Sequence, residues 1–351
     1  MDSFGGGERY ILTVAELLSS NNQVDLLLDS HLQLLITEDM KNDLGKRFNL
    51  NLSEVKLVKA PLGRGKGFLS KFFFLRKYDL VFFLTDGSIF YSTAKRNIIH
   101  FQVPFKNTVA RSLWGRIKLS SWNLAVCNSK FTQSVIEKDW PIKSQVIYPP
   151  VDVEAIKPLN KKKQILSVGR FASFSKLKKH EMMIKAFKEL HQEKKISGWS
   201  LHLVGSIEGD NGYIEELKEL AKGLPIKFYP NLSFTGLVKL YGESSIYWHA
   251  AGFGEDNPAL MEHFGIATVE AMAGGCVPIV INSGGQVEIV ENELSGYLWN
   301  QINELKGFTT TLVKDNSLLV KLSANAVKRS KVFSKKFFQD NLLKLVKSLD
   351  E

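Results

Sequence analysis

Short apolar segments alternate with helix-forming stretches along the whole chain, and this alternation constrains the fold more than any other feature of the sequence. The strand candidates are residues 24–27, 55–58, 80–84, 97–101, 124–127 and 145–148, followed by 164–168, 201–205, 226–229 and 277–281. Strands that alternate with helices predict a parallel sheet with helices on both faces. In such sheets, ligands bind beyond the carboxyl ends of the strands.

The chain has 351 residues, which is too long for one typical hydrophobic core, so we expect two domains. The longest apolar runs, such as residues 80–84, are far too short to span a bilayer, and no signal peptide is visible. A cytosolic site of action is therefore expected, with the cytoplasmic membrane face as a further place of action. Cys127 and Cys276 each adjoin a predicted strand, where a buried, reduced thiol is the expected state.

The chain is basic, with a formal net charge of +10, and this predicts an acidic partner. Nucleic acid, an anionic membrane surface and a phosphorylated substrate all satisfy that requirement. No zinc-ligand spacing, basic helix or RNA-binding motif is present, so nucleic acid is not the expected partner.

Residues 248–290 carry the most informative pattern. Glu262 and Glu270 are separated by seven residues and enclose Phe264 and Gly265, where a helix is predicted to begin. The first N–H groups of a helix and its positive dipole end favour an anion, and Gly265 lets a ligand approach the backbone closely. Carboxylates suit sugar or ribose hydroxyls, because they accept hydrogen bonds from two hydroxyls at once. The pattern suggests a nucleotide-sugar site; the alternative is an ordinary α/β unit with two solvated glutamates.

This stretch resembles the retaining glycosyltransferases of the GT-B fold, specifically the large group-1 family (family 4). That family has two glutamates seven residues apart with Phe-Gly between them, then Glu-Ala-Met-Ala, a glycine, an apolar strand and a Gly-Gly turn. The matching residues here are Glu262, Glu270 to Ala273, Gly275, Pro278 to Val280, and Gly284-Gly285. The resemblance implies an α/β, GT-B fold, in which two Rossmann-like, doubly wound parallel-sheet domains face a central cleft.

The resemblance also implies the domain boundaries, because Ile-Tyr-Pro-Pro-Val-Asp at 147–152 matches the family's interdomain linker. Residues 1–150 are then the N-terminal, acceptor-side domain and 151–332 the C-terminal, nucleotide-sugar-binding domain, while 333–351 form a helix that crosses back to the first. In the family, a strand precedes the segment that corresponds to residues 5–9, and this first strand is missing from the sequence as given. A missing central strand predicts unpaired edges on its neighbours, unless another segment fills the gap.

The catalytic residues implied by the resemblance are two cations, a carboxylate and a histidine. Arg170 and Lys178 would hold the donor diphosphate, with Lys176 as the competing assignment for the lysine, and two fixed cations neutralise a leaving diphosphate without a metal. Glu262 would hold the sugar, and His100, at the carboxyl end of a strand, would contact it near the reaction centre. The alternatives are a surface salt bridge for Arg170, a solvated lysine run for Lys178 and a core histidine for His100.

The resemblance implies further contacts with the donor. They comprise a carboxylate for the ribose, backbone amides for phosphate and sugar, a glycine loop that approaches the phosphates, and a glycine that lets the base or a phosphate come close. In that order, the residues are Glu270; Phe264, Gly265 and Ile266; Gly6 and Gly7; and Gly205.

Two stretches of the N-terminal domain combine basic and aromatic residues, at 64–78 and at 111–118 with Trp122 nearby. Lys and Arg beside Phe and Trp on one helix suit an anionic membrane interface. The alternative is a core-facing helix with a solvated basic face. The resemblance favours peripheral membrane contact, since family members often dock their N-terminal domain on membranes.

The implied activity is transfer of a hexose from a UDP- or GDP-linked sugar to a glycan or lipid-linked acceptor hydroxyl, with retained configuration and without a metal or another cofactor. The wording Glu-His-Phe-Gly-Ile at 262–266 resembles mannosyltransferases that use GDP-mannose. A hexose-phosphate acceptor competes with the glycan or lipid. The alternatives are a GT-B-like nucleotide-sugar-binding protein without efficient turnover, and a protein that binds membrane or nucleic acid through charge alone.

Overall fold

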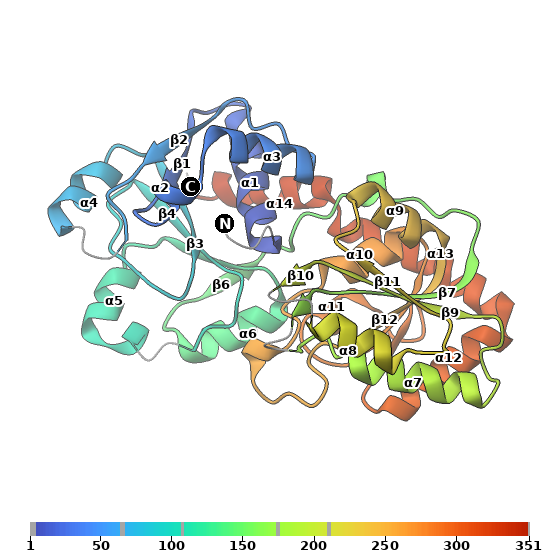
Figure 1. Cartoon of the computed structure of the whole chain (residues 1–351). Coiled ribbons are helices and arrows are strands. Elements are labelled where there is room, and N and C mark those ends of the chain that lie inside the picture. The colour runs from blue at the N-terminus through green and yellow to red at the C-terminus, as the bar shows by residue number, and fades with distance from the viewer. Residues whose placement is uncertain (1–4, 64–66, 107–108, 173–175, 209–211, 350–351) are drawn as a thin grey trace. The chain divides into compact units, whose positions relative to one another are not determined.

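The computed structural model describes residues 5–63, 67–106, 109–172, 176–208 and 212–349 (Figure 1). Residues 1–4, the basic residues Arg64 and Lys66, and residues 173–175 lie outside the described residues. The chain forms two compact units, which we call unit 1 (Met1–Pro150 with Lys336–Glu351) and unit 2 (Val151–Lys335).

Unit 2 is built on a six-stranded parallel sheet with the strand order β11-β9-β7-β12-β13-β14. From β7, the chain order runs outward through β9 and β11 on one side and through β12, β13 and β14 on the other. The order therefore reverses between β7 and β12, and doubly wound sheets bind ligands at the carboxyl ends of the strands beside such a reversal. The strands are β7 (Lys162–Val168), β9 (Ser200–Gly205), β11 (Ile226–Pro230), β12 (Ser244–His249), β13 (Val277–Ile281) and β14 (Tyr297–Trp299).

The central strands of unit 2 are covered on both faces, and every residue of β12 and β13 is buried. A parallel sheet between two layers of helices needs such near-continuous burial. On α7, Met183, Phe187 and Leu190 recur at helical spacing and pack on the core. The helices are α7 (His180–Gln192), α8 (Gly212–Leu220), α9 (Phe234–Glu243), α10 (Ile266–Ala273), α11 (Gln286–Ile289), α12 (Ile302–Lys314) and α13 (Asn316–Ser330), and a short parallel pair joins β8 (Phe171–Ala172) to β10 (Ile207–Glu208).

Unit 1 contains two parallel sheets in its described part, one of β1 and β2 and one with the order β3-β4-β5-β6. The strands are β1 (Val24–Leu28), β2 (Val55–Lys59), β3 (Leu80–Thr85), β4 (Arg96–Phe101), β5 (Leu124–Cys127) and β6 (Ser144–Val146). The helices are α1 (Gly6–Ser19), α2 (Leu32–Leu35), α3 (Glu38–Phe48), α4 (Phe68–Leu75), α5 (Leu113–Leu119), α6 (Lys130–Asp139) and α14 (Lys335–Lys347).

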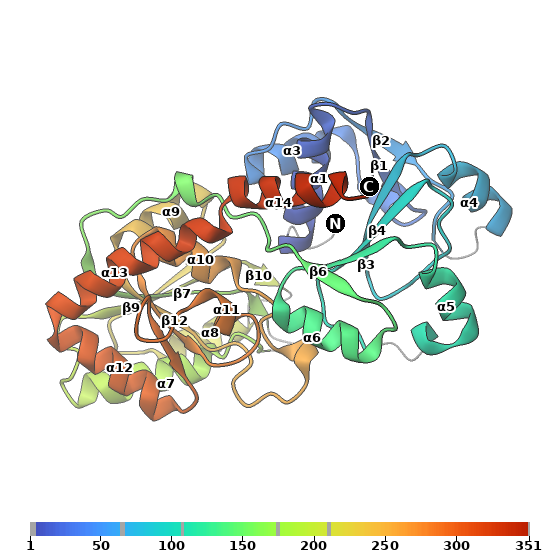
Figure 2. The ribbon, with the colours of Figure 1, turned by 180° about the vertical axis from the view of Figure 1, so that it is seen from behind.

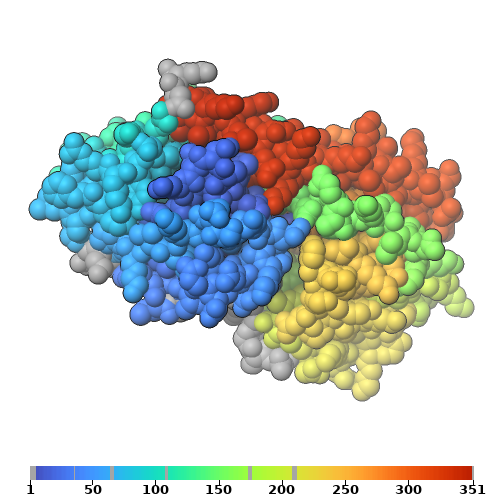
Figure 3. All heavy atoms as spheres, turned by 90° about the horizontal axis from the view of Figure 1, so that it is seen from above, coloured from blue at the N-terminus to red at the C-terminus, as the bar shows by residue number. Residues whose placement is uncertain are grey.

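Helix α1 packs against both sheets of unit 1. Tyr10 lies in one apolar cluster with Ile98 of β4 and Phe338 of α14, whereas Leu12 lies in another with Leu26 of β1. Figure 3 shows the red C-terminal segment directly against the dark blue N-terminal segment, and Figure 2 shows α14 beside α1 from behind. Among the described residues, no backbone hydrogen bond joins β1 to β3, so each of these strands has one strand partner.

The predicted α/β fold with parallel sheets is confirmed, and the predicted strands at 124–127 and 277–281 coincide with β5 and β13. Both cysteines are buried and free, as predicted, and burial raises the pKa of the Cys127 thiol to about 12. Gly6 and Gly7 differ from the expectation, because they form the first turn of α1 rather than a loop. No helix in the described part of the chain is long and apolar enough to cross a bilayer.

Candidate active site

Lys178 packs against the carboxyl end of β7. Gly169 follows β7, and a Cβ atom at this position would lie 2.7 Å from Cγ of Lys178. The missing side chain therefore lets the lysine lie directly against the end of the strand. Arg170 comes next in the chain and is exposed to solvent.

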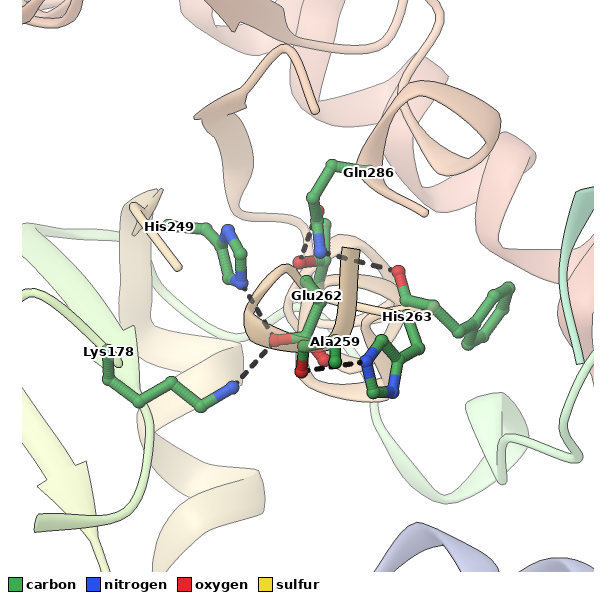
Figure 4. Close-up of polar contacts among 8 residues, drawn as sticks. Lys178, His249, Ala259, Glu262, His263 and Gln286 are labelled. Atoms are coloured by element: carbon green, nitrogen blue, oxygen red, sulfur yellow. Dashed lines mark hydrogen bonds and ion pairs between the residues drawn. The ribbon is translucent and has the colours of Figure 1, made fainter. Parts of the chain in front are cut away.

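Glu262 is the centre of a polar cluster at this end of the sheet, and Figure 4 shows Lys178 and His249 pointing toward it. Lys178 Nζ lies 2.6 Å and His249 Nε2 3.1 Å from the same oxygen, Glu262 Oε2. Since a carboxylate can only accept, the histidine carries its proton on Nε2. The side chains of Lys178 and Glu262 are 27% and 21% exposed, so both are accessible to a ligand, whereas that of His249 is 5% exposed.

The electrostatics of this cluster favour an ion pair beside a neutral histidine. Burial opposes ionisation of Glu262, but Lys178 and the hydrogen bond from His249 outweigh it and hold the pKa of Glu262 well below its usual range. Burial lowers the pKa of His249, although the carboxylate opposes this shift. The cluster therefore has no net charge at neutral pH. Lys178 retains two further N–H donors, which suit phosphate oxygens.

The predicted start of the helix after Phe264 is confirmed. Gly265 is the N-cap of α10 with φ 117° and ψ 58°, a left-handed conformation that favours glycine. A Cβ atom here would also lie 2.1 Å from Gln286 Nε2, because the Gln286 amide lies against this turn. Gln286 donates to the carbonyl of Phe264 (3.4 Å) and accepts from Thr268 Oγ1 (2.9 Å), so it fixes the first turn of α10.

The Gly-Gly turn after β13 supports the same segment from the other side. The N–H of Gly285 donates to the carbonyl of Glu262 at 2.8 Å. A Cβ atom at Gly284 would lie 2.3 Å from that carbonyl oxygen, and one at Gly285 would lie 2.5 Å from Cα of Phe264. Both glycines are therefore required by the close approach of two backbone segments.

Glu270 lies in the second turn of α10 and is 7% exposed. Its Oε2 accepts a hydrogen bond from the hydroxyl of Tyr241 at 3.1 Å. Burial and the neighbouring Glu270 raise the pKa of Tyr241 well above its ordinary value, so this hydroxyl keeps its proton. The structure provides a protein partner for Glu270, and its contact with a ribose stays a prediction.

The two candidate lysines point to different carboxylates. Lys176 Nζ lies 2.8 Å from Glu181 and 3.4 Å from Glu216, whereas Lys178 contacts Glu262. This geometry favours Lys178 as the lysine of the site.

The sequence left open whether His249 is structural or lines the cleft, and it gave no sign of the pairing of Lys179 with Glu255. His249 ends β12, a strand that was not among those predicted. Lys179 Nζ lies 2.5 Å from Glu255 Oε1, and both side chains are mostly buried. Lys179 also has φ 55°, a left-handed conformation that favours glycine.

His100 lies in unit 1 and is fully buried. Its ring stacks on Tyr10, with the centroids 3.9 Å apart, and Gln102 is a polar neighbour that opposes the lowering of its pKa. Burial lowers its pKa to about 3, so the imidazole is neutral. Its role at the donor sugar stays a prediction.

The packing of the backbone by itself requires a glycine at position 205. A Cβ atom at this position would lie 1.9 Å from the carbonyl oxygen of Gly169, so the ends of β7 and β9 can only approach with a glycine here. Its contact with the base or a phosphate of the donor stays a prediction. Gly7 packs near Leu84 and Gln102 within unit 1, and its contact with donor phosphates stays a prediction.

Two of the relatives to which this chain is similar carry the name of a mannosyltransferase. The protein named GDP-Man:Man(3)GlcNAc(2)-PP-Dol alpha-1,2-mannosyltransferase from Dictyostelium discoideum is 30% identical over 252 residues, which are 64% of this chain and 47% of the relative. The protein of the same name from Mus musculus is 32% identical over 198 residues, covering 50% of this chain and 38% of the relative. The chain thus spans less than half the length of these relatives.

Solved structures share the fold over nearly the whole chain. A glycosyltransferase from Rickettsia africae has a TM-score of 0.77 at 17% identity and covers 100% of this chain and 96% of its own. Anabaena HepE in complex with UDP and glucose has a TM-score of 0.67 at 17% identity and covers 98% and 96%. The fold is therefore GT-B, as predicted. The family model described as glycosyl transferases group 1 matches residues 152–329, and the chain belongs to that family.

Proposed function

We propose that this protein transfers mannose from GDP-mannose to a hydroxyl group of a lipid-linked glycan, with retention of configuration and without a metal. The observation that carries the proposal is the cluster of Lys178, Glu262 and His249 beside the start of α10, at the strand ends where the chain order of the sheet reverses. The names of the relatives support GDP-mannose as donor and a dolichol-linked acceptor.

In the proposed reaction, the bond between the sugar's anomeric carbon and the diphosphate oxygen breaks. The acceptor oxygen bonds to the same face of that carbon, and its proton passes to the departing diphosphate. Lys178 and Arg170 would stabilise the charge that develops on the leaving group, a task for which fixed cations suffice. The first amides of α10 would bind phosphate and sugar.

The carboxylates would hold the hydroxyl-bearing parts of the donor. Glu262 would accept hydrogen bonds from the sugar, and the bond from His249 keeps its carboxylate oriented. Glu270 would accept from the ribose in addition to Tyr241. Because the Lys178–Glu262 pair is neutral overall, Arg170 and the positive end of α10 would have to balance the diphosphate.

Nucleotide binding tests the donor site directly. We expect GDP and GDP-mannose, with a chelator present, to raise the melting temperature of the purified chain, because a ligand of the folded state stabilises it. UDP and ADP should shift it less. Glu270→Ala and Arg170→Ala should each weaken the shift by GDP, whereas Glu216→Ala, at an exposed ion pair of Lys176, should not. A shift by UDP alone would refute GDP-mannose, and no shift in a folded sample would refute the donor site.

Product analysis tests turnover and stereochemistry. Incubation with GDP-mannose and an alkyl-linked mannoside should yield a product with an α-linked mannose, detected by NMR. The separate sheets of unit 1 favour one competing function, a nucleotide-sugar-binding protein without efficient turnover. Binding of GDP-mannose without product would support that competitor, and a β-linked product would contradict retention.

A further inference from the structure

Arg329, in the last turn of α13, binds the end of α11 with its guanidinium group. Its Nε donates to the carbonyl of Ile289 at 3.1 Å, and its Nη2 donates to the carbonyl of Glu288 at 2.6 Å. Helix α11 has only four residues, and the last carbonyls of a helix have no partner within it. One cation therefore caps this end of α11. Helix α13 also packs against α10, as Figure 2 shows from behind.

Helix α11 in turn supports the first turn of α10, where the donor phosphate and sugar are proposed to bind. Gln286, its first residue, is fully buried and makes hydrogen bonds to Phe264 and Thr268 (Figure 4). Ile289, its last residue, is also fully buried, and its Cδ1 lies 3.3 Å from the place of a Cβ atom at Gly265. Both ends of α11 thus contact the turn at the start of α10.

A second series of contacts joins Arg329 to the same turn through Phe333. The guanidinium carbon of Arg329 lies 5.1 Å from the centre of the Phe333 ring, which is a cation–π contact. The Phe333 ring meets the Phe264 ring edge to face, with the centres 5.6 Å apart. Both rings are buried, and close-packed side chains transmit a displacement to their neighbours.

The backbone of Phe333 is held by contacts that do not involve Arg329. Its carbonyl accepts a hydrogen bond from the N–H of Val151 at 3.1 Å, and the N–H of Lys335 donates to the carbonyl of Val151 at 2.9 Å. Val151 and Ser334 form a parallel β-bridge between these bonds. Phe333 is therefore a fixed support for the cation and the ring that pack on it.

We propose that Arg329 is a positioning residue of the donor site, which aligns the first N–H groups of α10 with the donor phosphate next to the sugar. This inference rests on the proposed function, which assigns those N–H groups to phosphate and sugar. The competing explanation is that Arg329 only stabilises the fold by capping α11. The two explanations differ for phosphate binding, because only a positioning role connects Arg329 to the N–H groups of α10.

The test compares the affinities of GDP and GMP for the full chain by calorimetry. Both nucleotides have the base, the ribose and one phosphate, and only GDP has the phosphate next to the sugar. Arg329→Gln should weaken GDP binding about tenfold, as for one lost charge-assisted hydrogen bond, and GMP binding by less than about twofold. Arg329→Lys should lie between, because an ammonium group lacks the planar fork of donors. Glu270→Ala, which removes the proposed ribose contact, should weaken both nucleotides alike.

Two control variants separate positioning from charge and from stability. Glu291→Gln removes the ion pair of Arg329 Nη1 with Glu291 Oε1 (3.2 Å) and leaves both carbonyl contacts. Lys306→Met removes the ion pair of Lys306 with Glu189 (2.6 Å), which joins α12 to α7. Both variants should keep the ratio of GDP to GMP affinity of the unmodified chain.

Hydrogen–deuterium exchange tests the alignment without a ligand. In Arg329→Gln, a peptide that covers residues 262–272 should exchange about fivefold faster than in the unmodified chain, because the first turn of α10 opens more readily. A peptide that covers residues 180–192 of α7 should not change. If the unmodified chain does not bind GDP, the proposed function fails, and this measurement still decides whether Arg329 positions α10.

The inference is overturned if Arg329→Gln weakens GDP and GMP by the same factor, or if exchange at 262–272 rises no more than at 180–192. If Arg329→Gln does not fold, Phe333→Leu replaces it in both measurements. This variant keeps an apolar side chain but loses the ring that contacts Phe264, so it should show the same selective loss of GDP. An equal loss of both nucleotides in this variant would also overturn the inference.

Discussion

The two units differ in how their parallel strands are divided among sheets. In unit 2, one sheet contains six of the eight described strands, and β8 and β10 form a short separate pair. Several polar side chains of unit 2 are paired with one another: Lys178 with Glu262, Lys179 with Glu255 and Glu270 with Tyr241. In unit 1, the described strands divide into two sheets, and α4 and α5 leave large apolar side chains exposed.

This difference indicates which unit can bind a small, charged ligand. A small, highly charged ligand needs fixed donors and acceptors, and a closed sheet with glycine-mediated backbone contacts fixes them. A bilayer needs no such precision, because apolar area and positive charge suffice. The most informative motif, at residues 248–290, accordingly lies in unit 2.

The largest expected effect contrasts two lysines of unit 2. Lys178→Met removes a cation from the site and leaves Glu262 without its ion pair, so kcat/KM for GDP-mannose should fall about 100-fold or more. Steady-state kinetics measures this. Lys176→Met should change kcat/KM less than about twofold, because its partners Glu181 and Glu216 are exposed. Equal losses would contradict the assignment of Lys178.

A backbone contact in unit 2 should be almost as sensitive. Gly205→Ala would place Cβ 1.9 Å from the carbonyl oxygen of Gly169, so we expect destabilisation by about 3 kcal/mol, the upper range for overpacking. Urea unfolding followed by circular dichroism measures it. The control is Gly307→Ala in α12, where a Cβ meets nothing within 4 Å and helix propensity favours alanine by about 1 kcal/mol. A tolerated alanine at 205 would show that this end of the sheet is not tightly closed.

Replacing a buried histidine in each unit should have an intermediate effect on the free energy of unfolding. For His100, this effect should depend on pH within a defined range. Burial lowers the pKa of His100 to about 3, whereas an unfolded histidine titrates near 6.5. The unfolded state therefore binds the proton first, and this residue should cost about 1.4 kcal/mol of stability per pH unit as the pH falls from about 6.5 toward 3. His100→Phe, which keeps the stack on Tyr10, should reduce the slope of unfolding free energy against pH.

The matched variant in unit 2 is His202→Phe. Both nitrogens of His202 are hydrogen-bonded, to Ser200 (2.9 Å) and Tyr229 (3.1 Å), so its replacement should already lower stability at pH 8 by about 1–2 kcal/mol. His100→Phe should have little effect at that pH. An unchanged pH slope in His100→Phe would show that this histidine is not buried as described.

The smallest expected effect concerns Lys179, which combines a left-handed backbone with an ion pair to Glu255. A double-mutant cycle with Lys179→Met and Glu255→Gln should give a coupling of about 1 kcal/mol, measured by urea unfolding. Lys179→Gly loses the pair but relieves the backbone, so it should be more stable than Lys179→Met by about 1 kcal/mol. If methionine were the more stable, backbone strain at this residue would be negligible.

Much of the fold could be predicted because burial in parallel sheets leaves continuous apolar runs. The segment 277–281 is such a run, and it became β13. Strand β12 was not predicted, because Ser244 and Ser245 open it and it follows α9 without an intervening turn. Without that strand, the sequence left open whether His249, its last residue, is structural or lines the cleft.

Only the part of the site that lies within the motif at residues 248–290 could be predicted in detail from the sequence. The start of α10 follows from Gly265, since the need for glycine is local. The pair of Lys179 with Glu255 joins residues that are 76 positions apart, and one sequence does not show such pairing. The outward orientation of Phe73 and Trp114 was also undetermined, because α4 and α5 have eight and seven residues, too few to establish a periodic apolar face.

The ion pair between Lys178 and Glu262 has a consequence for the end of the catalytic cycle under the proposed function. A cation that grips a diphosphate also slows its departure, because leaving would strand the cation. In the structure, Lys178 Nζ lies 2.6 Å from Glu262 Oε2. Glu262 can therefore pair with Lys178 as the nucleotide leaves, and it competes with the product diphosphate for this lysine. Glu262 would then set the dwell time of GDP as well as the placement of the sugar.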